Sequence, residues 1–142
     1  MGSGFSRTFS DDRTWNDVMD IELDIWLRGT NHATSHVISP VHREPRAWTD
    51  GDVAAVLAGM LRALERAGNP GSDAERPIAL RGFSWIVNPF ETGGVVIALE
   101  LTLGAVIAGP FDVPERELNT MIARVVAAER AAGASEPRET IH

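Results

Sequence analysis

The sequence predicts an α+β fold in which a mostly antiparallel sheet carries two amphipathic helices on one face. One stretch alternates apolar and polar residues with the period of a strand, and two later stretches repeat apolar residues with the period of a helix. The strand-like stretches come in neighbouring groups instead of alternating singly with helices, which is typical of α+β proteins. The expected element order is β(β)αββ(β)α.

The first strand is expected over residues 19–28. Its apolar positions are Met19, Ile21, Leu23, Ile25 and Leu27, and the residues between them are Asp20, Glu22, Asp24, Trp26 and Arg28. This alternation predicts a strand with one buried and one open face. A turn at residues 29–31 would allow residues 35–39 to return as a second strand, which Pro40 is expected to end because proline cannot donate to a strand ladder.

The clearest helix is expected to follow Thr49. The Thr49 side chain can cap it, with Asp52 as an aspartate variant of the capping box, and Gly68 and Pro70 are expected to end it. Its apolar residues recur at helical spacing and form a single stripe: Val53, Val56, Leu57, Met60, Leu61 and Leu64.

The second half of the chain predicts two strands, near residues 78–88 and 94–103, joined by a hairpin loop. The apolar stretch continues to Gly109, so we expect a bend or bulge at Gly104. Asp112 is expected to cap a second helix, with Pro114 in its first turn and its end near Gly133.

A chain of 142 residues is the size of one domain. We expect a flexible N-terminal arm over residues 1–14, a single α+β domain over 15–133 and a polar C-terminal tail over 134–142.

Charge narrows the range of partners. Twenty acidic residues oppose 13 basic ones, which gives a net charge of −7. Because nucleic acids and anionic membranes attract basic surfaces, we expect no nucleic-acid partner and no membrane partner. No apolar run reaches the roughly 18 to 20 residues of a membrane span. An acidic surface instead suits a basic protein partner.

Two residue types are missing, and each absence excludes a kind of chemistry. All basic residues are arginine, so catalysis by a lysine amine is excluded. No cysteine is present, which excludes thiol nucleophiles, disulfides and thiolate metal sites. The lack of cysteine fits a reducing cytoplasm, and arginine without lysine indicates a bacterial genome rich in G and C. No cofactor is predicted.

Asp20, Glu22 and Asp24, here called the acidic stripe, are expected on the open face of the sheet. The strand near residues 78–88 is ambiguous, because either Leu80 and Ile86 or the set Phe83, Trp85 and Val87 could face inward. Whichever set stays outside could form an exposed apolar patch, which usually marks an interface. The predicted binding residues are Asp20, Glu22, Asp24, Trp26, Arg81 and Trp85.

Simpler interpretations of this face remain open. The acidic stripe is also typical of a solvated strand face that discourages aggregation, and Phe5 and Phe9 of the N-terminal arm could cover the patch. Paired carboxylates could alternatively serve acid–base chemistry or hold a hard cation.

A second candidate site is the loop over residues 29–48. Histidine and carboxylate side chains are suitable zinc ligands, and four of them fall in this stretch: His32, His36, His42 and Glu44. Positions 32 and 36 would lie about 13 Å apart on a strand, so only a folded loop could bring them to one ion. Ordinary loop histidines are the simpler interpretation.

The sequence contains no catalytic signature. The first hypothesis is a small, acidic, cytoplasmic protein-binding module that is homodimeric or bound to a basic protein. It is similar to immunity proteins and secretion chaperones in size and charge only. The second is a small-ligand-binding protein or metal-assisted enzyme that uses loop 29–48. The third is a structural subunit of a larger assembly.

Overall fold

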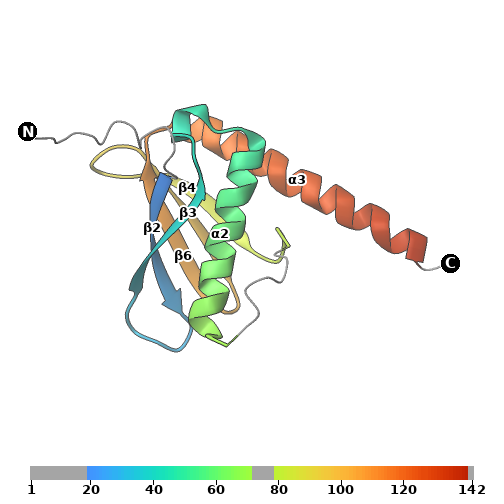
Figure 1. Ribbon diagram of the computed structural model, residues 1–142, viewed down its shortest axis with the longest axis horizontal. Helices are drawn as coiled ribbons and strands as arrows, with labels where there is room; N and C mark the ends of the chain where they lie inside the picture. Colours follow the sequence, from blue (N-terminus) through green and yellow to red (C-terminus); the bar gives the residue numbers. More distant parts are fainter. Residues whose placement is uncertain (1–18, 72–78, 141–142) are drawn as a thin grey trace, which may run out of the picture.

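The computed structural model describes residues 19–71 and 79–140 and confirms the predicted α+β fold (Figure 1). Residues 1–14, the predicted arm, lie outside the described residues. The strands are β2 (Met19–Leu27), β3 (Thr34–Val41), β4 (Ser84–Pro89), β5 (Val95–Leu101) and β6 (Gly104–Phe111). The helices are a short 3-10 turn, η1 (Pro45–Ala47), and two long helices, α2 (Asp50–Gly68) and α3 (Glu115–Thr140).

The five strands form one antiparallel sheet in the order β3-β2-β6-β5-β4. β2 and β3 form a hairpin, and β4, β5 and β6 form a meander. β6 then pairs with β2, so the last strand in sequence lies at the centre of the sheet. Helix α2 follows the β3 edge strand and packs over β3, β2 and β6, and the chain then continues to β4 at the opposite edge (Figure 1).

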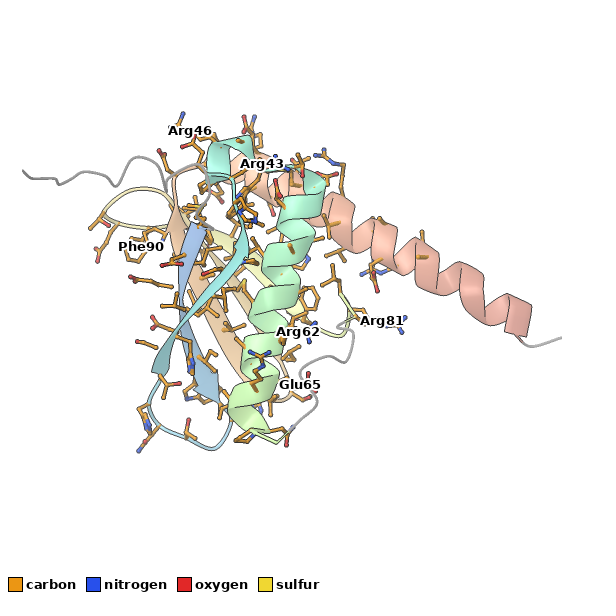
Figure 2. The ribbon with its side chains drawn as sticks, in the orientation of Figure 1. Arg43, Arg46, Arg62, Glu65, Arg81 and Phe90 are labelled. Carbon is orange, nitrogen blue, oxygen red and sulfur yellow. The ribbon has the colours of Figure 1, made fainter. Side chains whose placement is uncertain are left out.

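The start of α2 has the predicted capping box. The Asp52 N–H donates to Thr49 Oγ1 at 3.2 Å, and the Thr49 N–H donates back to Asp52 Oδ2 at 2.9 Å. Arg43 Nε also donates to Asp52 Oδ2 at 2.8 Å, and Figure 2 shows Arg43 beside the first turn of α2. The bond from Arg43, followed by the one from the Thr49 backbone, lowers the pKa of Asp52.

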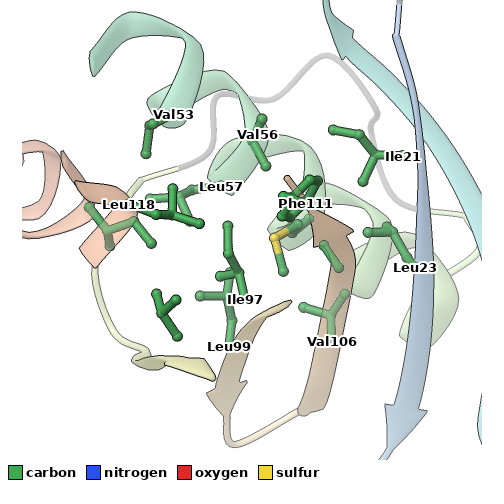
Figure 3. Packing of buried hydrophobic residues seen from close by; sticks show 14 of the residues in the cluster. Ile21, Leu23, Val53, Val56, Leu57, Ile97, Leu99, Val106, Phe111 and Leu118 are labelled. Atoms are coloured by element: carbon green, nitrogen blue, oxygen red, sulfur yellow. The ribbon is translucent and has the colours of Figure 1, made fainter. Parts of the chain in front are cut away.

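The core lies between the sheet and the two helices (Figure 3). The predicted inward residues of β2, including Leu23, pack there with Ile97 and Leu99 of β5. The stripe of α2 is buried against them, with Leu57 fully enclosed, and Leu118 is the first buried residue of α3. Both long helices therefore cover the same face of the sheet, which confirms that part of the prediction.

Pro40 does not end the second strand, so that prediction was wrong. β3 continues to Val41, which pairs with Met19. The register of the two strands shifts between this pair and the pair of Ile21 with Ile38. Because β3 is an edge strand, one of its sides has no ladder to lose, and proline is tolerated at edges and bulges.

The bend expected at Gly104 is a tight turn between two strands, so the strand that the predicted order β(β)αββ(β)α left optional is present as β6. β5 ends at Leu101, and Gly104 pairs directly opposite it as the first residue of β6. A Cβ atom at Gly104 would overlap the carbonyl oxygen of Trp26 on the neighbouring strand. Glycine is thus required here by the close approach of β2.

Helix α3 begins later and ends later than the sequence predicts. Its first i to i−4 bond runs from the Leu118 N–H to the Pro114 carbonyl at 3.1 Å, so the helix begins at Glu115. Asp112 instead accepts a bond from Arg46 Nη2 at 3.1 Å. The helix continues past Gly133 through positions predicted as a polar tail, and its C-terminal half projects away from the sheet (Figure 1).

Candidate functional site

The face of the sheet opposite the helices is the first candidate site, here called the open face. The strand register shows which side chains share it, because directly paired residues point to the same side. Asp24 pairs with Ile107, Ile107 with Ala98 and Ala98 with Ile86, so one row crosses from β2 to the β4 edge. This row begins at the acidic stripe and becomes apolar.

The exposed apolar residues gather on this side of the molecule. Val37 is 61% exposed, Ile86 52% and Ile107 43%, and all three lie on the open face. Phe90, 42% exposed, stands on the β4–β5 loop (Figure 2). Within the described residues these four are the large exposed hydrophobic side chains, so the apolar surface is concentrated and not scattered.

The acidic stripe lies where the sequence predicts it, on β2 beside this apolar surface. Serines of the neighbouring edge strand hold its two ends. Ser39 Oγ donates to Asp20 Oδ1 at 2.7 Å, and Ser35 Oγ donates to Asp24 Oδ1 at 3.3 Å. Consecutive carboxylates stand about 7 Å apart, since same-face positions on a strand are separated by two residues.

The open face has carboxylates but no cations within its strands. Glu100 of β5 adds a fourth carboxylate at the other end of the sheet, where it pairs with Ser84 and Ala105. None of the described strand positions on this face is an arginine. Arg43, Arg46 and Arg124 form ion pairs around the helices and their entry loops instead.

A hollow of about 590 Å³ opens on this face, near the end of the sheet where β6 ends and β5 begins. Its lining residues include Glu22, Asp24, Val37, Phe90, Val96 and Ile107. One wall is therefore carboxylate and the rest is largely aliphatic and aromatic.

Trp85 does not lie on the open face, and Arg81 lies outside the strands. Trp85 pairs with Leu99, so it points to the helix side and packs against the core, which is a correction to its expected place beside Trp26. The strand starts at Ser84, and Arg81 precedes it as an exposed residue. Of the two inward sets considered for this strand, Phe83, Trp85 and Val87 pack in or against the core. The other set divides, because Leu80 is also buried while Ile86 is exposed.

Trp26 does lie on the open face, at the end of the sheet away from the hollow. It pairs with Ala105 and is partly exposed. Its Nε1 donates to the Thr30 carbonyl at 2.9 Å, which ties the ring to the β2–β3 turn.

The structure does not bring the predicted metal ligands together. His32 precedes β3, His42 and Glu44 follow it, and β3 alone spans eight residues, or roughly 26 Å at about 3.3 Å each. His36 pairs with Leu23 and so points to the helix side, where its Nε2 lies 2.8 Å from Thr34 Oγ1. Across residues 19–71 and 79–132, whose side chains the structure describes, no group of three His, Asp or Glu side chains is placed to hold a metal ion.

Val37, Phe90 and Ile107 are not among the binding residues predicted from the sequence. Two of them carried a usable signal, because consecutive apolar residues at 37–38 and 105–108 break the alternation of their strands. A strand that is apolar on both sides must expose one side if only one face of its sheet is covered. Phe90 stands in a turn and carried no such signal.

No protein family, curated protein or solved structure matches this chain. No helix in the described ranges is long and apolar enough to cross a membrane. A function must therefore be inferred from the surfaces of the chain itself.

Proposed function

We propose that this protein is a small acidic protein-binding module that docks a basic partner protein on its open face. The observation that supports the proposal is the juxtaposition of Val37, Ile86 and Ile107, all exposed, with the acidic stripe on the same face. Concentrated apolar surface usually marks an interface. Carboxylates beside it favour a basic partner and speed the encounter.

Charge favours a basic partner over a second copy of the chain. Face-to-face stacking of two copies would bring two acidic stripes together, and the described strands offer no arginine on this face to neutralise them. Like charges opposed across an interface are unfavourable. A homodimer through the open face is therefore the less favoured arrangement.

The proposal places the protein in the cytoplasm. A chain without cysteine has no disulfide to lose under reducing conditions.

The test is native mass spectrometry of the untagged protein purified gently from the cells that make it. Two variants are compared with the unmodified chain: Ile107→Arg, on the open face, and Ala127→Arg, at an exposed position of α3. The arginine at position 107 would stand opposite Asp24, a favourable cross-strand pair that keeps the sheet intact while it repels a basic partner. We expect a bound basic protein with the unmodified chain and with Ala127→Arg, and at least about tenfold less with Ile107→Arg.

Three results would contradict the proposal. A complex that survives Ile107→Arg would place the interface elsewhere. A dimer that Ile107→Arg abolishes would show that the face takes a second copy. A bare monomer from the unmodified chain would leave the face without a partner.

A further inference from the structure

We propose that the hollow on the open face receives an arginine side chain of the partner, with its guanidinium group between Glu22 and Asp24. This inference rests on the proposed function and names the partner group that would anchor it. It follows from the lining of the hollow, from the hydrogen bonds of its carboxylates and from the place of Phe90.

Each carboxylate of the hollow has an apolar residue beside it on the next strand. Val37 of β3 pairs with Glu22, and Ile107 of β6 pairs with Asp24. An arginine carries a chain of methylene groups that ends in a charged planar head. The stem would cover the aliphatic side chains while the head reaches the carboxylates.

The carboxylates retain acceptor capacity for such a ligand. Asp24 receives one long bond from Ser35 at its Oδ1, which leaves Oδ2 open. The Glu22 side chain forms no hydrogen bond or ion pair with the part of the chain that the structure describes. Both acids are on one strand, about 7 Å apart, so a single guanidinium with five N–H donors can reach toward both.

The aromatic ring favours guanidinium over a simple ammonium. Phe90 lines the hollow from the β4–β5 loop, which projects at the left of Figure 2. A guanidinium stacks on an aromatic face and bonds carboxylates in its own plane, whereas an ammonium is a compact point charge. At about 590 Å³ the hollow falls in the size range of small-molecule sites, with room for residues that flank the arginine.

The experiment is a titration of the full-length ¹⁵N-labelled chain with Nα-acetylarginine N-methylamide, followed by ¹H–¹⁵N spectra. The citrulline analogue, which has the same shape without the charge, is the control probe. We expect the arginine probe to shift the amides of Glu22, Asp24 and Ile107 with saturation in the millimolar range, and the citrulline probe to leave them unchanged.

Matched variants separate the hollow from the general charge of the face. Glu22→Gln removes one lining carboxylate and is expected to weaken probe binding about threefold, the scale of an exposed ion pair. Glu100→Gln removes a carboxylate from the same face but outside the hollow, and we expect a change of less than about 1.5-fold, because exposed charges further apart are screened by salt. Phe90→Ala is expected to weaken binding about twofold to fivefold through loss of the ring.

Three outcomes would overturn the inference. Equal shifts with citrulline would show that charge plays no part. Equal weakening by Glu22→Gln and Glu100→Gln would show diffuse attraction to the face. Binding that appears only after deletion of residues 1–18 would show that the chain occupies the hollow itself.

The two proposals can fail separately. If Ile107→Arg releases the partner but Glu22→Gln does not and the arginine probe fails to bind, the open face docks a protein without an arginine anchor. If the probe binds in the hollow but the partner complex survives Ile107→Arg, the hollow takes an arginine and the docking proposal is wrong.

Discussion

Two isoleucines on adjacent strands provide a sharp test of which face of the sheet stabilises the fold. Ile97 of β5 is 0% exposed and faces the helices, whereas Ile107 of β6 is 43% exposed and lies on the open face. Ile97 pairs with Ala108, and Ile107 pairs with Ala98, so the two side chains are near neighbours on opposite sides of one sheet. Replacing each with alanine makes the same chemical change in two environments.

The two substitutions should differ severalfold in their effect on the free energy of unfolding. Ile97→Ala removes fully buried atoms and leaves a cavity under the helices, which costs about 2 to 5 kcal/mol. For a domain of this size each kcal/mol lowers the melting temperature by roughly 2–4 °C. Ile107→Ala leaves no cavity, and its side chain realises little more than half of the roughly 1.5–3 kcal/mol of full burial, so we expect a loss of about 1 kcal/mol.

Equilibrium urea unfolding followed by tryptophan fluorescence measures both values. Trp48 is buried and makes an edge-on contact with Phe111 at a centroid distance of 5.0 Å, so its emission should report loss of the core. Equal losses for the two variants would refute the inference that the open face is uncovered. If the midpoint of Ile107→Ala also varied with protein concentration, a second copy would be the cover.

Three further predictions concern the fold around the site, and each is measured by the same unfolding experiment. Thr49→Ala removes one half of the capping box and should cost about 1 kcal/mol. Arg43 lowers the pKa of Asp52 in the folded state. The stability that the ionised Asp52 contributes should therefore be complete above its unfolded pKa of about 3.9, and should be lost as the pH falls through the lower folded pKa. Asp52→Asn should remove this part of the dependence of stability on acid pH. Gly104→Ala should be among the most destabilising single changes in the sheet, since the new methyl group meets the Trp26 carbonyl and cannot be relieved without moving β2 away from β6.

Elements with a complete pattern in their own sequence were predicted well. β2 alternates along its length, and the structure buries Ile21, Leu23 and Ile25 while the acidic stripe stays outside. Helix α2 has its cap, its stripe and its terminator within one continuous segment. In both cases the period alone decides which residues are buried, and the period can be read without knowledge of the neighbours.

Elements that depend on their neighbours were predicted less well. Trp85, Ile86 and Val87 are consecutive and apolar, so no period assigns a face, and only the pairing of Trp85 with Leu99 turns it to the core. Pro40 is tolerated because β3 lies at the edge of the sheet, which follows from the strand order and not from the local sequence. The turn between β5 and β6 is marked by Gly104 alone, and a lone glycine is equally compatible with a bulge.

The hollow could not be predicted from the pattern of any single strand, because it depends on β6 lying between β2 and β5. This order places Ile107 beside Asp24 and brings the β4–β5 loop, with Phe90, to the same end of the open face. The acidic stripe by itself is compatible with a solvated strand. Because an exposed isoleucine lies on one side of the stripe and an exposed valine on the other, solvation of the carboxylates alone does not account for the surface. A binding role accounts for both kinds of residue. The apolar side chains favour burial against a partner, and the carboxylates favour a partner that is basic.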